Sequence, residues 1–356
     1  MPKAIRKFIK FLCGIMAFLI IASAIVLGSA VYFNSPPGEL PSPAESAMRI
    51  EDGSLSIEVR NGESANSVGQ RLEKAGVIRS RYFWNLLFRI DREYIKTGTY
   101  RIDLPSSQLD IRSILINGEQ LLVKVTIPEG VTLQKAARIL EDEGICMAQD
   151  FLAAAYSGEI LSAYNVPGPS MEGYLYPDTY LFPLNYPAAK VVLAMADTFF
   201  KKLNDFIPEA FGKNTISASE LNERLIIASI VEREYVIGEE APLIAGVFYN
   251  RMKIGMALQS CATVEYVITE IQGRPHPELL FNRDLEIRDP YNTYMNPGLP
   301  PGPISAPGET SLRAAFNPAS SDYLYFRVID AEAGRHYFSR TLDDHIRAGS
   351  LYLKRR

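Results

Sequence analysis

The sequence has few of the residues that bind metals. Its 356 residues include three cysteines and three histidines, and the histidines (His276, His336 and His345) are scattered. There is no HExxH, no CxxC and no Asp/Asn-rich calcium loop, so a metal site is not expected. No GxSxG motif and no glycine-rich phosphate loop occurs either, which argues against serine hydrolases and nucleotide-dependent enzymes. The sequence therefore predicts no cofactor.

The three cysteines give little support for a disulfide. Cys13 falls in an apolar N-terminal run, which leaves Cys146 and Cys261 as a possible pair. A bond between them is permitted outside the cytoplasm. Two buried free thiols are the favoured prediction.

Acidic residues outnumber basic residues outside the N-terminus. The formal net charge is −4, and Lys3, Arg6, Lys7 and Lys10 precede the apolar run. The remainder holds 33 basic and 41 acidic residues, a net charge of −8. A nucleic-acid-binding protein would carry the opposite sign. The sequence therefore predicts no nucleic-acid partner.

The N-terminal segment has the features of a membrane anchor. Residues 11–33 contain no charge and follow a basic tail over residues 1–10. This predicts a transmembrane helix with a cytoplasmic N-terminus and a body outside the cytoplasm. A cleaved signal peptide ending near Gly28-Ser29-Ala30 is the alternative, but its apolar core would be unusually long. Residues 34–50, rich in Pro, Ser and Glu, are expected to form a stalk.

Beyond the stalk the pattern predicts an α+β protein with a small module and a larger body. Residues 51–120 read as strand, helix, helix and strand, the size and order of a LysM-like βααβ module. Residues 121–160 partly repeat this plan and are expected to form a second LysM-like or connecting segment. Neither carries a chemical motif, so both are predicted to be scaffold. Residues 161–356 are predicted to form a mixed α+β catalytic domain that ends in strands over residues 323–328 and 336–338.

The stretch IIASIVEREY carries the strongest chemical signal. Ser217 and Glu220 form an S-x-x-E capping box, which predicts a helix start. The run Leu225–Val231 is uncharged and predicts a helix buried nearly all round. Glu232 follows directly, and burial there would raise the pKa of its carboxyl group, as in a general acid. The alternative is that Glu232 is the first exposed residue past a core helix, paired with Arg233 or with a residue four positions away.

Amide, hydroxyl and aromatic side chains follow Glu232 along the chain. Such groups suit a sugar, which offers hydroxyls at its edges and C–H groups on its faces. The candidates are Gln259, Thr263, Tyr266, Tyr291, Asn292, Thr293 and Tyr294. Taken alone, the YNTY segment would be a surface turn with packed tyrosines.

Six motifs occur in a fixed order, and their combination is more specific than any one of them. They are EGYLYPDTY (172–180), ASIVEREY (228–235), NRMKIGMALQ (250–259), YNTY (291–294), GLPPGPISAPG (298–308) and DYLYF (322–326). Together they closely resemble the endolytic murein transglycosylases, the MltG or YceG-like family. The resemblance implies a lyase that cleaves the β-1,4 bond between N-acetylmuramic acid and N-acetylglucosamine in peptidoglycan. It also implies a single-pass protein of the bacterial cytoplasmic (inner) membrane that works near peptidoglycan synthases.

The resemblance also implies roles for individual residues. Glu232 matches the family's catalytic glutamate. The positions expected to bind substrate are Gln259, Thr263, Tyr266, Tyr291, Asn292, Tyr294 and Glu172. One departure is visible, because the family commonly reads QTDPTV where this chain has QSCATV (259–264). An acidic residue has become Cys261, which puts any role of that carboxylate in doubt.

A lytic transglycosylase needs one carboxylic acid, and Glu232 is predicted to be this single general acid and base, leaving 1,6-anhydro ends. The nearest alternative is a lysozyme-like hydrolase with Glu172 or Asp178 as a second carboxylate. A further alternative is a non-catalytic, membrane-anchored scaffold that binds glycan through its LysM-like module.

Overall fold

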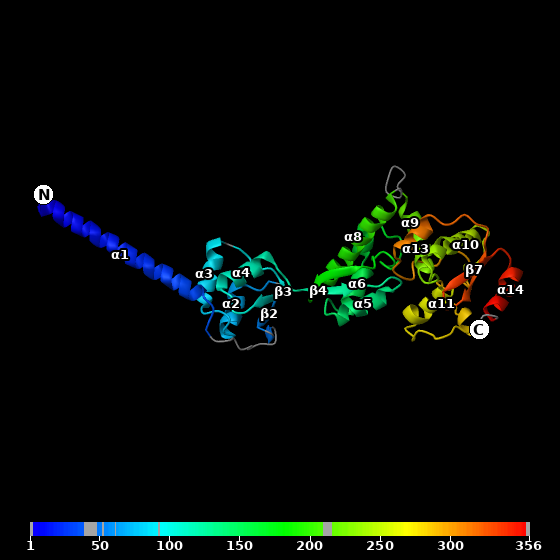
Figure 1. Cartoon of the computed structure of the whole chain (residues 1–356), viewed down its shortest axis with the longest axis horizontal. Helices are drawn as coiled ribbons and strands as arrows, with labels where there is room; N and C mark the ends of the chain where they lie inside the picture. Colours follow the sequence, from blue (N-terminus) through cyan, green and yellow to red (C-terminus); the bar gives the residue numbers. More distant parts are fainter. Residues whose placement is uncertain are drawn as a thin grey trace. The chain divides into compact units, whose positions relative to one another are not determined.

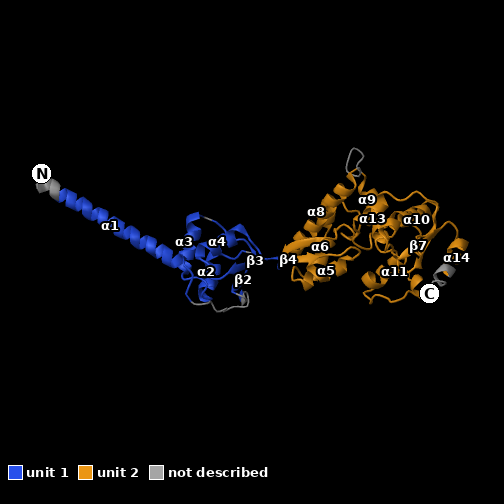
Figure 2. Cartoon of the chain, in the orientation of Figure 1, with its two compact units in different colours: residues 1–122, 183–185 blue, residues 123–182, 186–356 orange. Residues whose placement is uncertain are grey.

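The protein is a mixed α+β chain with one long N-terminal helix (Figure 1). The computed structural model describes residues 3–38, 48–51, 53–60, 62–91, 93–208 and 216–353. These divide into two compact units (Figure 2). The smaller unit holds residues 1–122 and 183–185, and the larger holds residues 123–182 and 186–356. The predicted α+β class is confirmed.

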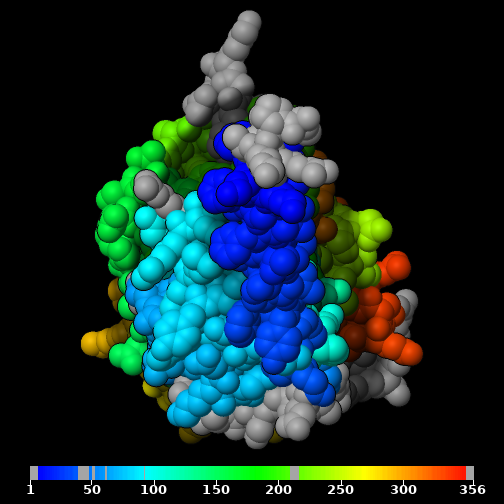
Figure 3. All heavy atoms as spheres, turned by 90° about the vertical axis from the view of Figure 1, so that its left-hand side faces the viewer, coloured from blue at the N-terminus to red at the C-terminus, as the bar shows by residue number. Residues whose placement is uncertain are grey.

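Helix α1 (Lys3–Asn34) fits the predicted membrane anchor over residues 11–33. Its segment Lys7–Asn34 is long and apolar enough to cross a bilayer, and none of its side chains is buried by the rest of the chain. Figure 3 shows the atoms of α1 (blue) open to the viewer along much of the helix. Most of the apolar surface of α1 is therefore exposed, and the helix contacts the small module near its C-terminal end, at Tyr32 and Phe33.

The first residues of the predicted stalk contact the small module. Arg79 donates from Nε to the carbonyl of Ser35 at 3.1 Å and from Nη2 to the carbonyl of Pro36 at 2.8 Å. The Phe33 and Phe83 rings stack with centroids 6.3 Å apart. Residues 39–47 of the stalk lie outside the described residues, so for them the stalk stays a prediction.

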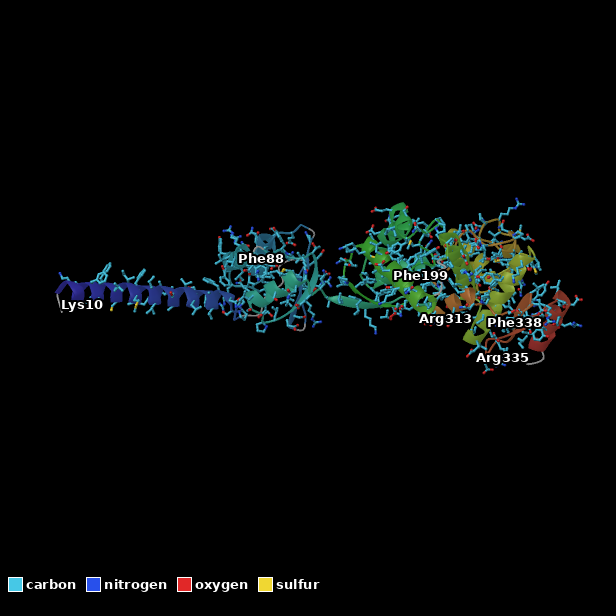
Figure 4. The ribbon with its side chains drawn as sticks, turned by 90° about the horizontal axis from the view of Figure 1, so that it is seen from above. Lys10, Phe88, Phe199, Arg313, Arg335 and Phe338 are labelled. Carbon is cyan, nitrogen blue, oxygen red and sulfur yellow. The ribbon has the colours of Figure 1, made fainter. Side chains whose placement is uncertain are left out.

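The small module is built around a three-stranded antiparallel sheet in the order β1-β2-β3. Its elements are β1 (Met48–Glu51), β2 (Ser54–Val59), α2 (Ala65–Lys74), α3 (Arg81–Asp91), β3 (Gly98–Asp103) and α4 (Gln108–Asn117). The predicted order of strand, helix, helix and strand is confirmed as β2, α2, α3 and β3. Trp84 and Phe88, one helical turn apart on α3, are buried in its core. Phe88 is labelled in Figure 4. Its assignment as LysM-like stays a prediction.

The boundary between the two units lies near residue 122, close to the predicted end of the small module at residue 120. Strand β4 (Leu122–Thr126) pairs with β5 (Thr179–Pro183), and Val125 and Ile127 belong to the core of the larger unit. Helices α5 (Leu133–Asp142), α6 (Ala148–Ala155) and α7 (Gly158–Ala163) follow. The segment expected to repeat the small module is therefore part of the larger unit, because its apolar residues are buried there.

The core of the larger unit forms around long helices. They are α8 (Ala188–Phe206), α9 (Ala218–Val231), α10 (Ala241–Lys253) and α13 (Glu309–Phe316). Helix α9 packs against α10 and α13, and Phe199 of α8 lies fully buried (Figure 4). The remaining elements are a 3₁₀ turn (Gly238–Glu240), α11 (Cys261–Tyr266), a π-helical turn (Val267–Ile271), α12 (Asn282–Leu285), β6 (Tyr325–Asp330), β7 (Arg335–Ser339) and α14 (Leu342–Leu353).

The two predicted C-terminal strands are confirmed as the antiparallel pair β6 and β7. Helix α14, which follows them, was not expected. Thr341 is a sequence signal for the start of this helix. Its hydroxyl accepts the backbone N–H of Asp344 at 3.3 Å, as an N-cap residue does.

Candidate active site

Helix α9 begins and ends close to where the sequence predicts. The Ser217 hydroxyl accepts the backbone N–H of Glu220 at 3.1 Å, so the serine cap is confirmed. The Glu220 side chain pairs with Arg224 at 2.8 Å. Residues 225–231 are all buried, which confirms a helix covered nearly all round. The α9 helix thus delivers Glu232, its first residue past the last turn, to the edge of the core.

Ser229, the polar residue of this apolar run, holds the segment that completes the site. Its Oγ accepts the backbone N–H of Ile304 at 3.0 Å, and its carbonyl accepts the Ser305 hydroxyl at 3.0 Å. Ser229 and Ser305 are both fully buried. These bonds fix the GLPPGPISAPG segment against the last turns of α9.

A second chain segment holds the same stretch from another side. The Gly130 N–H donates to the Ala306 carbonyl at 2.8 Å, and the Ala306 N–H donates to the Val131 carbonyl at 2.8 Å. Residues 304–306 therefore lie between α9 and the turn after β4. Gly308, two residues further on, is the N-cap of α13.

The Glu232 carboxylate lies at the start of α13. Its Oε2 accepts the Gly308 N–H at 2.8 Å and the Ser311 hydroxyl at 2.6 Å. Its Oε1 lies 3.4 Å from the Tyr235 hydroxyl, which donates to it. Glu232 is half-buried while Ser311 is fully buried. The carboxylate is therefore held by three donors and keeps partial access to solvent.

Burial raises the pKa of the Glu232 carboxyl above its ordinary value. The hydrogen bonds from Ser311, Gly308 and Tyr235 favour the charged form and oppose this rise, and the nearby Glu129 carboxylate adds to it. The raised pKa predicted from the sequence is confirmed in direction, and its largest cause is burial, as expected.

Glu129 was not expected at the site. It lies in the turn Pro128-Glu129-Gly130, which the sequence marks only as scaffold. Its carboxylate lies directly against Gly308, since a Cβ added at Gly308 would stand 2.0 Å from Glu129 Oε1. Glu129 is exposed. The structure therefore brings a second carboxylate towards Glu232.

Tyr176 lies near several acidic side chains around the site. Burial raises the pKa of the Tyr176 hydroxyl to about 12, and the carboxylates of Glu129, Glu309, Asp178 and Glu232 raise it as well. Asp178, a candidate second carboxylate, accepts the backbone N–H of Thr179 at 2.7 Å.

The side chains of Arg233 and Glu234 fix the turn after α9 to the region around α11. Arg233 pairs with Glu265 at 2.8 Å, and the Glu234 carboxylate accepts the Ser260 hydroxyl. Burial raises the pKa of Glu234 to about 7. Arg233 thus pairs away from Glu232, which leaves that carboxylate without the ion pair assumed by the alternative interpretation.

Two of the predicted substrate-binding residues, Gln259 and Tyr294, line a cavity of about 380 Å³. Glu234 lies on this lining, whereas Glu232 does not. Gln259 is exposed with φ of 49°, an uncommon conformation for a residue other than glycine. Cys261 Sγ lies 3.2 Å from the Tyr294 hydroxyl, and Cys261 is exposed. Cys146 and Cys261 are free thiols, as predicted, but neither is fully buried, because Cys146 is half-buried and Cys261 is exposed.

Glu172, Tyr266 and Tyr291 form a separate cluster. The two tyrosine rings lie 5.0 Å apart. Both carboxylate oxygens of Glu172 accept the backbone N–H of Leu133, at 3.2 and 3.1 Å, at the start of α5. Glu172 is buried, which raises its pKa to about 8. Its contacts within the protein are those of a helix cap, and its contact with substrate stays a prediction.

Asn292 and Thr263 are fully buried. Asn292 Nδ2 donates to the carbonyls of Leu285 and Ile287 at 2.9 and 2.8 Å. The Thr263 hydroxyl donates to the Ser260 carbonyl at 2.7 Å. Both side chains hold loops around the cavity together, and a direct contact of either with substrate stays a prediction.

No group of three or more His, Cys, Asp and Glu side chains within the described part of the chain could hold a metal ion. What the site offers is one half-buried carboxyl group beside a helix N-terminus, with acidic and aromatic side chains around it.

Comparison with known proteins identifies the family of this chain. The family model described as the YceG-like family matches residues 57–350, which include every element of the site. The chain belongs to the YceG-like family. The match begins in β2 and ends in α14, so it covers both units.

Two curated relatives of this YceG-like chain carry the name endolytic murein transglycosylase. The one from Streptococcus pneumoniae serotype 2 (strain D39 / NCTC 7466) is 30% identical over 328 residues, which cover 82% of this chain and 57% of the relative. The one from Bacillus subtilis (strain 168) is 28% identical over 352 residues, which cover 92% of this chain and 91% of the relative. The chain thus spans little more than half the length of the pneumococcal relative.

A solved structure also matches the YceG-like chain. The crystal structure of a putative yceG-like protein from Listeria monocytogenes is 30% identical, with a TM-score of 0.55. The match covers 83% of this chain and 99% of that one. The likeness supports the fold of both units, each taken separately.

Proposed function

We propose that this protein is a membrane-anchored endolytic peptidoglycan lytic transglycosylase. The enzyme cleaves the β-1,4 bond between N-acetylmuramic acid and N-acetylglucosamine without consuming water, and Glu232 is its single general acid and base. The observation that carries the proposal is the Glu232 carboxyl group, half-buried and held by Gly308 and Ser311. The family membership and the names of the relatives support it.

The first step is protonation of the leaving group. Burial raises the pKa of Glu232, so that its carboxyl group retains a proton closer to neutral pH. That proton passes to the glycosidic oxygen as the bond to the muramic acid breaks and an oxocarbenium-like state develops. General acid catalysis of this kind contributes about 10²–10⁴-fold.

The second step uses the carboxylate formed in the first. Glu232 takes the proton from the C6 hydroxyl of the same muramic acid, and the hydroxyl oxygen bonds to the anomeric carbon. The product ends in a 1,6-anhydro ring, and Glu232 is protonated again. Because nucleophile and electrophile belong to one sugar, proximity replaces a second catalytic carboxylate.

The donors around Glu232 suit both steps. The Gly308 N–H and the Ser311 hydroxyl stabilise the carboxylate after it has lost its proton, and the N-terminus of α13 adds a favourable dipole. Burial favours the protonated form beforehand. Opposing influences of this kind keep a carboxyl group able both to give and to take a proton near neutral pH.

A hydrolase is the second candidate, and Glu129 is the observation that favours it. A hydrolase needs a second carboxylate to activate water or to attack the sugar. Glu129 lies against Gly308 and adds to the pKa of Glu232, whereas Glu172 is occupied as the cap of α5. If Glu129 acted in this way, Glu129→Gln would abolish cleavage as completely as Glu232→Gln.

The anchor and the partners are part of the same proposal. Helix α1 holds the enzyme in the cytoplasmic (inner) membrane with its N-terminus inside, and the two units lie on the outer side, where peptidoglycan is made. There the enzyme releases or terminates growing glycan strands beside the synthases. The length and apolar composition of α1 support the anchor.

The proposal is tested with the full chain, purified peptidoglycan strands and two matched variants. Glu232→Gln keeps the shape of the side chain and removes its proton chemistry, so products disappear while strand binding and the melting temperature are retained. Glu239→Gln, an exposed carboxylate on the following turn, keeps full activity. Unchanged product formation by Glu232→Gln would refute the proposal. Retained binding with lost cleavage would exclude the non-catalytic scaffold.

A further inference from the structure

The cavity beside Glu234 has a chemical character that cleavage does not explain. It has a volume of about 380 Å³ and is lined by the β6–β7 pair, by α14 and by residues near the start of α11. Its walls are aromatic and apolar at Tyr294, Tyr325, Phe326, Val328 and Leu342. A concave site with apolar walls and a few polar groups is the usual form of a ligand site.

Two arginines line this cavity without an acidic partner. Arg251 is 7% exposed and donates to the carbonyls of Leu324 and Leu258. Arg327 donates from Nη1 to the His345 carbonyl at 3.2 Å, and its buried Nε has no hydrogen-bond partner. Within the described part of the chain, neither guanidinium forms a salt bridge. Arg251 is buried and Arg327 is half-buried. Because a buried charge is normally paired with an opposite one, these two guanidinium groups suit an anion in the cavity.

The other titratable groups of the cavity leave its charge positive. Burial lowers the pKa of His345, and the charges of Arg327 and Arg251 lower it further, so this imidazole is neutral at neutral pH. The Glu234 carboxylate is turned to the Ser260 hydroxyl, and burial raises its pKa to about 7. His336, on the remaining wall, holds Glu240 at 2.7 Å. On the cavity lining, the positive charges of Arg251 and Arg327 are therefore opposed only by the partly ionised carboxyl group of Glu234.

We propose that this cavity binds a carboxylate of the peptide stem carried by the muramic acid, through Arg251 and Arg327. The inference rests on the proposed function, since it concerns the same substrate. The sugar backbone of a peptide-bearing strand has no charge, whereas the stem ends in carboxylates. Guanidinium groups bind carboxylates through strong paired hydrogen bonds. The enzyme thus favours strands whose stems carry free carboxylates.

The position of the cavity along the chain suits this role. Glu234 on its lining is two residues from Glu232, so their Cα atoms are at most about 7 Å apart. A stem on the muramic acid at the cleaved bond extends away from the sugar and reaches the cavity while the glycosidic oxygen lies at Glu232. Binding there positions the reacting sugar without touching the reacting atoms.

The test compares two substrates that differ only in charge. One is peptidoglycan strands with native stems, and the other is the same strands after coupling of their carboxyl groups to methylamine. We expect the wild-type protein to cleave the neutralised strands with a kcat/KM about tenfold lower. Arg327→Gln should cleave both substrates at that lower value, and Arg327→Lys should recover part of the preference. Arg335→Gln, an exposed arginine on β7 that is labelled in Figure 4, should keep the full preference.

Binding gives a second readout that does not depend on cleavage. The Glu232→Gln variant should bind native strands more tightly than neutralised strands, and adding Arg327→Gln should remove the difference. Equal binding of both strands by Glu232→Gln, or equal cleavage of both by the wild type, would overturn the proposal. So would an Arg327→Gln protein that is folded by its melting temperature and still prefers native strands. If the wild-type protein cleaved neither substrate but still bound native strands more tightly, the proposed function would be refuted. The proposal that the cavity binds a stem carboxylate would stand.

Discussion

The backbone N–H of Gly308 donates to the carboxylate of Glu232 at 2.8 Å, across 76 residues of sequence. This contact joins the end of the buried α9 helix to the start of α13. It depends on Ser229, whose hydroxyl and carbonyl hold residues 304 and 305 in place. The reactivity we assign to Glu232 therefore arises from the way three chain segments meet.

The Ser311 hydroxyl should set the pH range of the enzyme. Its hydrogen bond favours the charged form of Glu232, so Ser311→Ala should raise the pKa of Glu232 further. Because the proposed reaction starts from protonated Glu232, the pH above which kcat/KM falls should move upwards. The check is the pH profile of kcat/KM, with Ser311→Thr as the variant that keeps the hydroxyl. An unchanged profile in Ser311→Ala would contradict this account.

Ser229 should matter for activity although it cannot touch substrate. Ser229→Ala leaves the buried Ile304 N–H without its acceptor, which costs about 1–3 kcal/mol of unfolding free energy. The substitution also loosens the segment that positions Gly308 against Glu232. We therefore expect kcat to fall several-fold although Glu232 itself is not substituted. Denaturant unfolding and steady-state kinetics on one preparation provide both values. A stability loss with full kcat would mean that the segment does not position Gly308.

Glu172 should make the protein less stable as the pH rises. Burial raises its pKa from 4.5 to about 8, so between these values the folded state holds a proton that the unfolded state has lost. Stability is then highest at low pH and falls by a few kcal/mol, as an order of magnitude, between about pH 4.5 and 8. Glu172→Gln should reduce that slope while keeping an acceptor for the Leu133 N–H. Urea unfolding at pH 5 and pH 8 measures this change in unfolding free energy. An equal change in the wild type and in Glu172→Gln would contradict the prediction.

Asn292 should act on stability more than on substrate binding. Asn292→Ala removes the side-chain donor to the carbonyls of Leu285 and Ile287, which should cost about 2–4 kcal/mol of unfolding free energy. Urea unfolding checks the loss, and KM on glycan strands shows whether a substrate contact is lost as well. Normal stability with a raised KM would restore the direct role that the sequence suggests.

The sequence predicted the parts of the site that depend on local pattern. The serine cap, the apolar run and the position of Glu232 after it are confirmed, because capping and burial periodicity act within one helix. The strands β6 and β7 follow from the same kind of local signal. The anchor over residues 11–33 fits α1 because apolar length alone defines such a segment.

What the sequence did not predict depends on contacts between distant segments. Gly308 and Ser311 lie in a turn-rich stretch whose approach to Glu232 is set by Ser229. Glu129 looks like an ordinary turn residue until Gly308 is placed against it. In the same way, the residue type of Asn292 suggests a sugar contact, but only the fold shows that its amide turns to buried carbonyls.

The most direct test of the account is the mass of the glycan ends left by the wild-type protein on peptidoglycan strands. A single acid and base at Glu232 predicts muramic acid ends that carry the 1,6-anhydro ring, lighter by one water than reducing ends. Glu232→Gln should give neither kind of end. Reducing muramic ends from the wild-type protein would contradict the central claim and favour a hydrolase with a second carboxylate.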